Sequence, residues 1–242
     1  MSTALDPLAP ATLDLARRIS TATLTSQLQK RGFANSFMLG VLPLRPETRL
    51  AGLAFTLRFI PMREDLDPPG ETDNRTSKQR LAVEAVGPGD VLVIDARGDV
   101  GAATLGDILA TRIQHRGAAG IVTDGAFRDT PSIRALDLAT YARGQNPYAS
   151  TRIHHPQDIN VPIGCAGVAV VPGDLIVGDG EGVVVVPRAV AEEVVRAAFE
   201  QDQRETFIMA KIRGGASILG VYPPDASTLA EYEDWKRTSG SL

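Results

Sequence analysis

Two short apolar runs, residues 91–95 and 119–123, constrain the fold of this 242-residue chain more than any other feature. Both consist mainly of aliphatic side chains without polar alternation, which is typical of strands buried on both faces. Between them, residues 106–116 place apolar side chains at helical spacing, and Gly117 is a typical helix end. A strand–helix–strand unit with parallel strands is therefore expected, and with it an α/β fold.

The apolar pattern of the helix at 106–116 also predicts which of its side chains face the core. Ile108, Leu109 and Ile113 recur at the spacing of one helical face, and Ala110 is a further candidate. These residues are expected to pack against the two neighbouring strands.

The rest of the chain follows from the same patterns. Residues 61–78 are polar, charged and Pro-rich, which is typical of a loop. We expect a single domain over residues 1–242, with a core at about 35–213. The other expected elements are helices at 11–31, 79–85, 131–143 and 189–213, strands at 51–60, 161–171 and 174–186, a loop at 147–155, and an irregular tail at 214–242.

Composition excludes several kinds of partner. A net charge of −4 and an aromatic content of 5% provide neither a basic surface nor stacking platforms, so direct binding of nucleic acid is not expected. The single cysteine, Cys165, excludes an intrachain disulfide and a Cys-rich zinc site. No apolar run approaches the roughly 20 residues of a membrane span, and no signal peptide is recognisable. We therefore expect a cytoplasmic protein without a membrane partner.

Three polar residues are placed where an active site of an α/β protein would form. Asp107 lies at the start of the expected helix at 106–116, and Arg128 and Asp129 follow the strand at 119–123 through an expected turn at 124–126. Because sites gather beyond the carboxyl ends of parallel strands, these side chains are expected to meet at one edge of the sheet.

The chemistry of these groups suits an anionic substrate and a divalent cation. Amides of a first helical turn, here near Ile108 and Leu109, can bind a carboxylate. Arg128 offers a planar fork for a carboxylate or an oxyanion, and Asp129 is an oxygen ligand suited to Mg²⁺ or Mn²⁺. A structural alternative stays open from spacing alone: Asp107 caps the helix, and Arg128 and Asp129 form a surface ion pair.

Gly106-Asp107-Ile108-Leu109, followed about twenty residues later by Arg128-Asp129, resembles the signature of the RraA-like family. The runs GDVLVID at 89–95, GAAGIVTDG at 117–125 and GDGEGVVVVP at 178–187 resemble that family as well. The resemblance covers roughly residues 35–213. The family includes class II pyruvate aldolases that act on 4-hydroxy-4-methyl-2-oxoglutarate and regulators of ribonuclease E.

The resemblance implies a swivelling β/β/α-type sandwich core with N- and C-terminal helical extensions, assembled as a trimer or a dimer of trimers. It implies that the amides of Gly106 to Leu109, together with Arg128, bind the pyruvyl part of a substrate. Asp129 would hold Mg²⁺, Mn²⁺ or another divalent cation, which Asp107 would reach through water. In the aldolase branch a glutamate of the neighbouring subunit completes this interface site. Glu205 fits that place best, ahead of Glu193 and Glu200.

The residues and the resemblance lead to the hypothesis that the protein is a metal-dependent lyase. It would cleave 4-hydroxy-2-oxo acids to pyruvate and a carbonyl product through a metal-stabilised enolate. Arg128, Asp107 and Glu205 are its expected catalytic residues, and oxaloacetate decarboxylation follows from the same chemistry. Two alternatives remain. One is a non-catalytic regulator of a ribonuclease E-like activity, and the other is a lyase or hydratase acting on a sugar-derived 2-oxo acid.

Other residues of types common in active sites are expected to have structural roles. Adjacent His154 and His155 would point in opposite directions on a strand, so a metal site with Asp158 is disfavoured and a solvated loop is expected. Cys165 lies in an apolar run and is expected to be buried and inert. The Pro-Gly-Asp turns at 88–90 and 172–174 each precede an apolar strand. They indicate either two similar turns or a pseudo-symmetric core.

Overall fold

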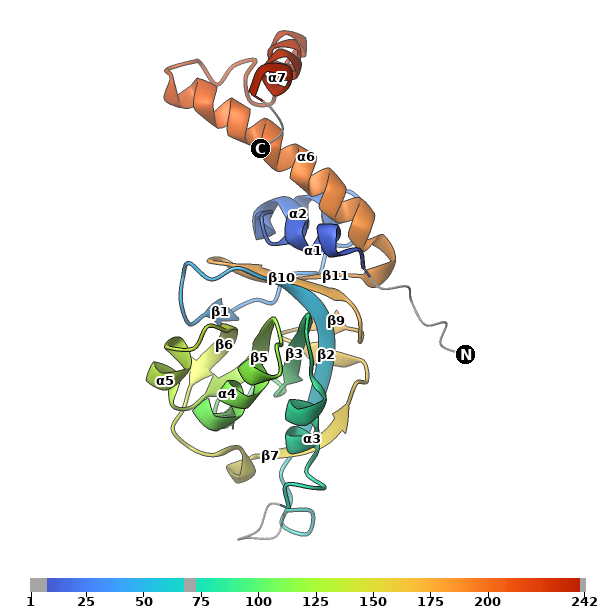
Figure 1. Ribbon diagram of the computed structural model, residues 1–242, viewed down its shortest axis with the longest axis vertical. Coiled ribbons are helices and arrows are strands. Elements are labelled where there is room, and N and C mark those ends of the chain that lie inside the picture. The colour runs from blue at the N-terminus through green and yellow to red at the C-terminus, as the bar shows by residue number, and fades with distance from the viewer. Residues whose placement is uncertain (1–7, 68–72, 240–242) are drawn as a thin grey trace.

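A curved mixed sheet organises the protein (Figure 1). The computed structural model describes residues 8–67 and 73–239, and within them nine strands form this sheet, in the order β1-β6-β5-β3-β2-β10-β11 with β4 beside β5 and β7 beside β2. Its strands are β1 (Leu42–Pro43), β2 (Leu50–Pro61), β3 (Asp90–Asp95), β4 (Ala103–Leu105), β5 (Gly120–Phe127), β6 (Ala139–Gln145), β7 (His154–Ile159), β10 (Leu175–Asp179) and β11 (Gly182–Val186). A separate hairpin consists of β8 (Ile163–Cys165) and β9 (Val168–Val170).

The sheet is nearly closed by the segment that precedes β1. The Met38 amide donates to the Val183 carbonyl at 2.9 Å, and the Val185 amide donates to the Ser36 carbonyl at 2.8 Å, while β1 itself pairs with β6. Aliphatic side chains from most of the strands, with Tyr141, fill the enclosed interior. Such apolar burial is the main favourable contribution to folding.

Helices cover the sheet on two outer sides (Figure 1). On one side lie α3 (Lys78–Ala85), α4 (Asp107–His115) and α5 (Thr130–Arg134), and on the other lie α1 (Pro10–Ala16), α2 (Thr21–Gln29) and α6 (Ala191–Arg213). Single 3₁₀ turns, η1 (Ser150–Arg152) and η2 (Arg188–Val190), follow β6 and β11, and α7 (Ala226–Ser239) packs on the distal end of α6. The expected α/β core with N- and C-terminal helical extensions is therefore confirmed. None of the helices in the described part of the chain is long and apolar enough to cross a membrane.

The predicted strand–helix–strand unit is present as β3, α4 and β5. The two strands pair in parallel, with Val91 opposite Gly120. Ala110 and Ile113 are buried as predicted, and Gly117, at φ 82°, ends the helix. The predicted inward position of Ile108 is wrong, because its side chain is 81% exposed. Ile108 precedes Ala110 by two residues, which places it on the opposite face of the helix.

Two elements near the candidate site differ from the prediction. The strand predicted at 119–123 continues through the expected turn to Phe127, because Ala126 and Phe127 pair with β6 and with β4. The helix predicted at 131–143 is wrong beyond the short α5. The chain from Ala139 onward forms β6, whose backbone pairs with both β5 and β1.

The later part of the chain also differs in places. The loop expected at 147–155 contains η1 and the start of β7, and each strand expected at 161–171 and 174–186 is a hairpin. The irregular tail expected at 214–242 contains α7, which buries Tyr232 against Phe207 of α6. In the predicted loop at 61–78, Pro61 ends β2 and Lys78 begins α3. The described residues between them form neither helix nor strand, and residues 68–72 lie outside the described part.

The two Pro-Gly-Asp turns are closely alike. Gly89 and Gly173 have φ values of 81° and 88°, a backbone region that favours glycine. Asp90 accepts a hydrogen bond from the Gly87 amide at 2.9 Å, and Asp174 accepts one from the Val171 amide at 2.8 Å. These contacts agree with two similar turns before two core strands.

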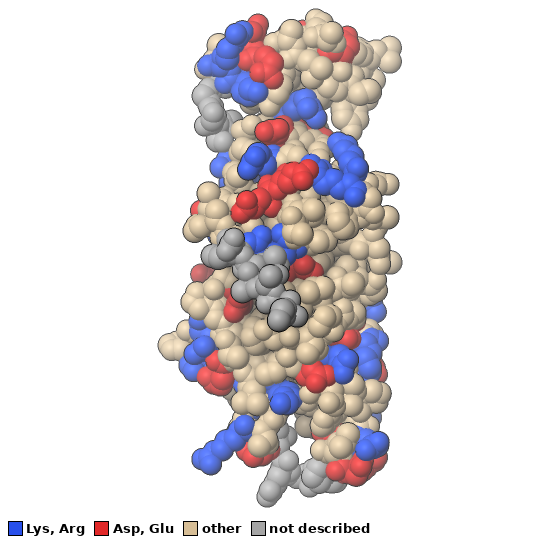
Figure 2. Space-filling model, turned by 90° about the vertical axis from the view of Figure 1, so that its right-hand side faces the viewer, with Lys and Arg blue, Asp and Glu red and all other residues tan. Residues whose placement is uncertain are grey.

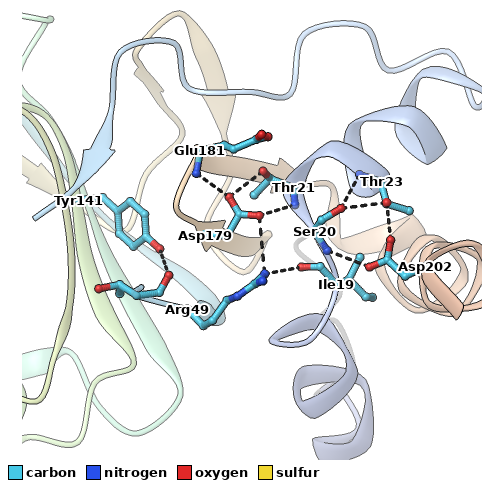
Figure 3. A network of polar contacts seen from close by, with 10 residues as sticks. Ile19, Ser20, Thr21, Thr23, Arg49, Tyr141, Asp179, Glu181 and Asp202 are labelled. Carbon is cyan, nitrogen blue, oxygen red and sulfur yellow. Dashed lines mark hydrogen bonds and ion pairs between the residues drawn. The ribbon is translucent and has the colours of Figure 1, made fainter. Parts of the chain in front are cut away.

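The single helix predicted at 11–31 is wrong because the chain breaks at Ser20 (Figure 3). The Ser20 hydroxyl accepts from the Thr23 amide at 3.0 Å and caps α2. The Ser20 amide donates to Asp202 of α6 at 3.0 Å, and the Thr21 amide donates to Asp179 of β10 at 2.8 Å. These carboxylates satisfy backbone donors that a continuous helix would have satisfied internally.

Candidate active site

The candidate site lies where β4 and β5 end side by side. Gly106 follows β4 and is the N-cap of α4, and the Arg128 amide donates to the Leu105 carbonyl at 3.1 Å. A hollow of about 180 Å³ forms at this edge. All six residues predicted for binding or metal ligation line it: Gly106, Asp107, Ile108, Leu109, Arg128 and Asp129.

Gly106 leaves the space in which this group comes together. A Cβ atom at that position would lie 2.8 Å from Oδ2 of Asp129 and 2.9 Å from Cγ of Arg128. The backbone of Gly106 is extended, with φ −121° and ψ −172°, which any residue adopts. The restriction at Gly106 is therefore one of space, because the missing side chain allows the Asp129 carboxylate to lie close to the start of α4.

The Arg128 and Asp129 side chains are paired and partly open to solvent. Arg128 Nε donates to Asp129 Oδ2 at 2.9 Å, and the side chains are 43% and 38% exposed. Asp129 has φ 55° and is the N-cap residue of α5, yet its side chain makes no capping hydrogen bond. A non-glycine residue in this left-handed region carries backbone strain of about 1 kcal/mol or more, and such strain concentrates at functional sites.

Asp107 does not cap α4 in the manner of the structural alternative. Gly106 occupies the N-cap position, and Asp107 Oδ1 accepts a hydrogen bond from the adjacent Ile108 amide at 2.8 Å. One amide of the expected anion cradle therefore already has an intrachain partner. The ion pair of the structural alternative is present, so Arg128 and Asp129 combine that contact with exposure to the hollow.

Residues from α3 and η1 complete the hollow, and sequence reasoning missed them. Gln79, Arg80, Ala149 and Ser150 all line it. Gln79 Nε2 donates to the Thr104 carbonyl, and Arg80 Nη1 donates to Gln79 Oε1 at 3.1 Å. Partial burial lowers the pKa of the Arg80 guanidinium. The site thus contains a second arginine that only the packing of α3 reveals.

Glu205 lies elsewhere in the single chain. It belongs to α6 and lines a hollow of about 670 Å³ together with Arg49, Asp202 and Trp235. Its Oε1 atom accepts a hydrogen bond from Gln201 at 2.8 Å. The two hollows share no lining residue. The placement of Glu205 in the site of a neighbouring subunit therefore stays a prediction.

The donor set fits a cation that keeps most of its water. Within the described ranges, no group of three or more His, Cys, Asp or Glu residues is arranged to hold a metal ion. Mg²⁺ is commonly bound through one or two carboxylates together with waters and substrate oxygens. Asp129 and Asp107, which line the same hollow, provide carboxylates of that kind.

His154, His155 and Cys165 do not form a metal site or a nucleophilic site. Both histidines lie on β7, so the expected solvated loop is wrong. The buried His154 stacks on Phe59, and burial lowers its pKa. His155 instead pairs with Asp67. Cys165 is fully buried, which raises its pKa and agrees with an inert thiol.

The fold and the hollow define an α/β protein with a polar pocket beyond the carboxyl ends of its parallel strands. The chain belongs to the RraA-like family, because the family model described as Aldolase/RraA matches residues 21–185. It is 39% identical over 153 residues to a protein of Halalkalibacterium halodurans named "Putative 4-hydroxy-4-methyl-2-oxoglutarate aldolase". That match covers 62% of this chain and 72% of the relative.

Two solved structures share most of the fold. An uncharacterized protein from Pseudomonas syringae pv. tomato has a TM-score of 0.78 at 28% identity, covering 90% of this chain and 100% of the other. Streptomyces coelicolor RraAS2, described as an unusual member of the RNase ES inhibitor RraA protein family, has a TM-score of 0.76 at 36% identity. That match covers 84% of this chain and 98% of RraAS2.

Proposed function

We propose that the protein is a divalent-metal-dependent lyase that cleaves 4-hydroxy-2-oxo acids, such as 4-hydroxy-4-methyl-2-oxoglutarate, to pyruvate and a carbonyl product. The observation that carries the proposal is the convergence of the α4 N-terminus, Arg128 and Asp129 on one hollow. Similarity to a relative named as an aldolase supports the same chemistry. The amides at the α4 N-terminus suit a substrate carboxylate, Arg128 suits an oxyanion, and Asp129 suits a divalent cation.

The proposed reaction assigns a separate task to each side chain. Cleavage breaks the C3–C4 bond: the C4 hydroxyl loses its proton, C4 becomes a carbonyl, and the electron pair passes to an enolate that is protonated at C3 to pyruvate. Arg128 binds the substrate oxygens and stabilises their negative charge. Asp107 takes up the proton that leaves the C4 hydroxyl. A divalent cation held by Asp129 would supply Lewis-acid polarisation of the 2-oxo group.

The proposal includes a shared site in an oligomer. Glu205 lies outside the hollow of its own chain. We propose that it enters the hollow of a neighbouring subunit within a trimer or a dimer of trimers. There it would help orient water and substrate beside Asp129. Oxaloacetate decarboxylation belongs to the same proposal, since loss of CO₂ also leaves the pyruvate enolate.

A substrate panel tests the function. Purified protein is assayed for pyruvate release from oxaloacetate and from 4-hydroxy-2-oxo acids, with added Mg²⁺ or Mn²⁺ and after treatment with a chelator. We expect release that depends on the cation. If no substrate releases pyruvate with either Mg²⁺ or Mn²⁺, the proposed lyase function is excluded.

A second candidate is a protein regulator of a ribonuclease E-like enzyme, which the similarity to RraAS2 favours. Such a protein would act through its surface rather than through the hollow. The face drawn in Figure 2 mixes basic and acidic side chains, so it carries no single-sign area for RNA itself. Co-purification with a ribonuclease partner, undiminished by Asp129→Ala, would favour this regulator, while loss of pyruvate release in the same variant would favour the lyase.

A further inference from the structure

A second, larger hollow adjoins the candidate site. It has a volume of about 860 Å³ and is lined by Met62, Leu66 and Asp67, by residues before and at the start of α3, and by residues of η1 and β7. Four residues line both hollows: Gln79, Arg80, Ala149 and Ser150. The two spaces therefore meet across the side chains of α3 and η1. A pyruvyl group held at Arg128 and Asp129 would leave the larger hollow to the remainder of the substrate.

An oriented histidine lines this second hollow. His155 Nδ1 lies 2.8 Å and 3.0 Å from the two carboxylate oxygens of Asp67, and the side chains are 21% and 16% exposed. The Asp67 carboxylate holds the imidazole ring through Nδ1, and this contact fixes the orientation and the tautomer of the ring. Within the described ranges, Nε2 of His155 has no hydrogen-bond partner.

Polar and apolar side chains both line the hollow around His155, the apolar ones including Met62, Leu66 and Pro156. Thr76, Ser77, Thr151 and Gln157 contribute hydroxyl and amide groups, and Lys78 and Arg80 contribute positive charge beside Asp67 and Asp73. His154, the neighbour on β7, also lines this hollow, but it is buried and its ring stacks on Phe59. An apolar substituent would leave these polar groups without partners, whereas hydroxyl groups can satisfy both donors and acceptors.

We propose that the second hollow is a subsite for the part of a 2-oxo acid substrate beyond C4, where His155, held by Asp67, hydrogen-bonds a substrate hydroxyl. This inference rests on the proposed lyase function and narrows its substrate class. The preferred substrates are polyhydroxylated 4-hydroxy-2-oxo acids of six carbons or more. A five-carbon 4-hydroxy-2-oxo acid that ends in a methyl group cannot use His155.

The test compares two substrates within each variant. Values of kcat/KM for pyruvate release are measured with 4,5,6-trihydroxy-2-oxohexanoate and with 4-hydroxy-2-oxopentanoate. The variants are His155→Gln, Asp67→Asn and, as a matched control, His115→Gln. His115 is exposed at the end of α4 and lines neither hollow. A ratio between substrates cancels any loss of folded protein, and thermal melting reports that loss separately.

The wild-type protein is expected to prefer the six-carbon substrate. That preference should fall about tenfold in His155→Gln and Asp67→Asn, the effect of one hydrogen bond in a desolvated site, and stay unchanged in His115→Gln. An unchanged ratio in both site variants, or a wild-type preference for the five-carbon substrate, would overturn the subsite alone. Oxaloacetate separates this result from failure of the lyase proposal, because a wild-type protein that releases pyruvate from none of the three substrates is no lyase of this kind.

Discussion

Substitution of Gly106 by alanine tests whether the hollow depends on the space that this residue leaves. The new Cβ atom would lie 2.8 Å from Asp129 Oδ2, 2.9 Å from Arg128 Cγ and 3.3 Å from Arg128 Cδ. Ordinary contacts of such atoms begin at about 3.4 Å. The Asp129 carboxylate and the methylene groups of Arg128 must therefore shift by about half an ångström. They can do so because both side chains are partly exposed.

The expected consequence is a loss of activity without a matching loss of stability. A displacement of about 1 Å at a reacting centre can reduce the rate about 100-fold, so a shift of half that size predicts a loss of roughly tenfold in kcat/KM. The backbone of Gly106 suits alanine, and the weaker N-cap costs about 1 kcal/mol. For a chain of this size that corresponds to a drop of about 2–4 °C in Tm.

The assay combines pyruvate release from oxaloacetate with thermal melting of the same preparations. Gly164→Ala is the matched control, because a Cβ atom there meets nothing within 4 Å. We expect the control to retain wild-type kinetics. Full activity of Gly106→Ala would refute the spatial argument, and so would a fall in Tm large enough to explain the lost activity by unfolding.

Two further predictions concern stability. Asp124 is buried and accepts hydrogen bonds from the amides of Ala96, Gly98 and Ala166 at 2.7–3.0 Å. Asp124→Ala should therefore lower the free energy of unfolding by about 3 kcal/mol or more. An unchanged midpoint of urea unfolding would contradict this role. Burial raises the pKa of Asp90, so the folded state holds its proton more tightly than the unfolded state, and ionisation lowers stability as the pH rises through that pKa. Asp90→Asn should therefore raise the free energy of unfolding at pH 7, and this gain over the wild-type protein should disappear below about pH 4. A gain that grows on acidification would contradict the prediction.

Local sequence patterns were sufficient for the elements that position the site. The apolar run of β3, the helical spacing of α4 and Gly117 each act over a few residues, and they were predicted correctly. Parallel pairing of β3 and β5 then followed from general topology and placed Asp107 and Arg128 at one edge. Their convergence on one hollow could be predicted because short-range patterns and a topological rule agree.

Other features depend on contacts between distant parts of the chain. The break at Ser20 relies on Asp202, 182 residues away, and the Thr21 amide relies on Asp179, 158 residues away. Strand β6 forms because β5 and β1 pair with it on both sides, which overrides its local helical pattern. Arg80 reaches the hollow only through the packing of α3. No local signal in the sequence reports such contacts.

Arg128 and Asp129 are proposed to form a metal-dependent site that releases pyruvate. The most direct measurement is pyruvate release from 4-hydroxy-4-methyl-2-oxoglutarate by the wild-type protein and by Arg128→Ala and Asp129→Ala, with Mg²⁺ and after exhaustive chelation. We predict release by the wild-type protein with Mg²⁺ alone, and none by either folded variant or after chelation. Full activity in either variant, or in the chelated wild-type protein, would contradict the claim.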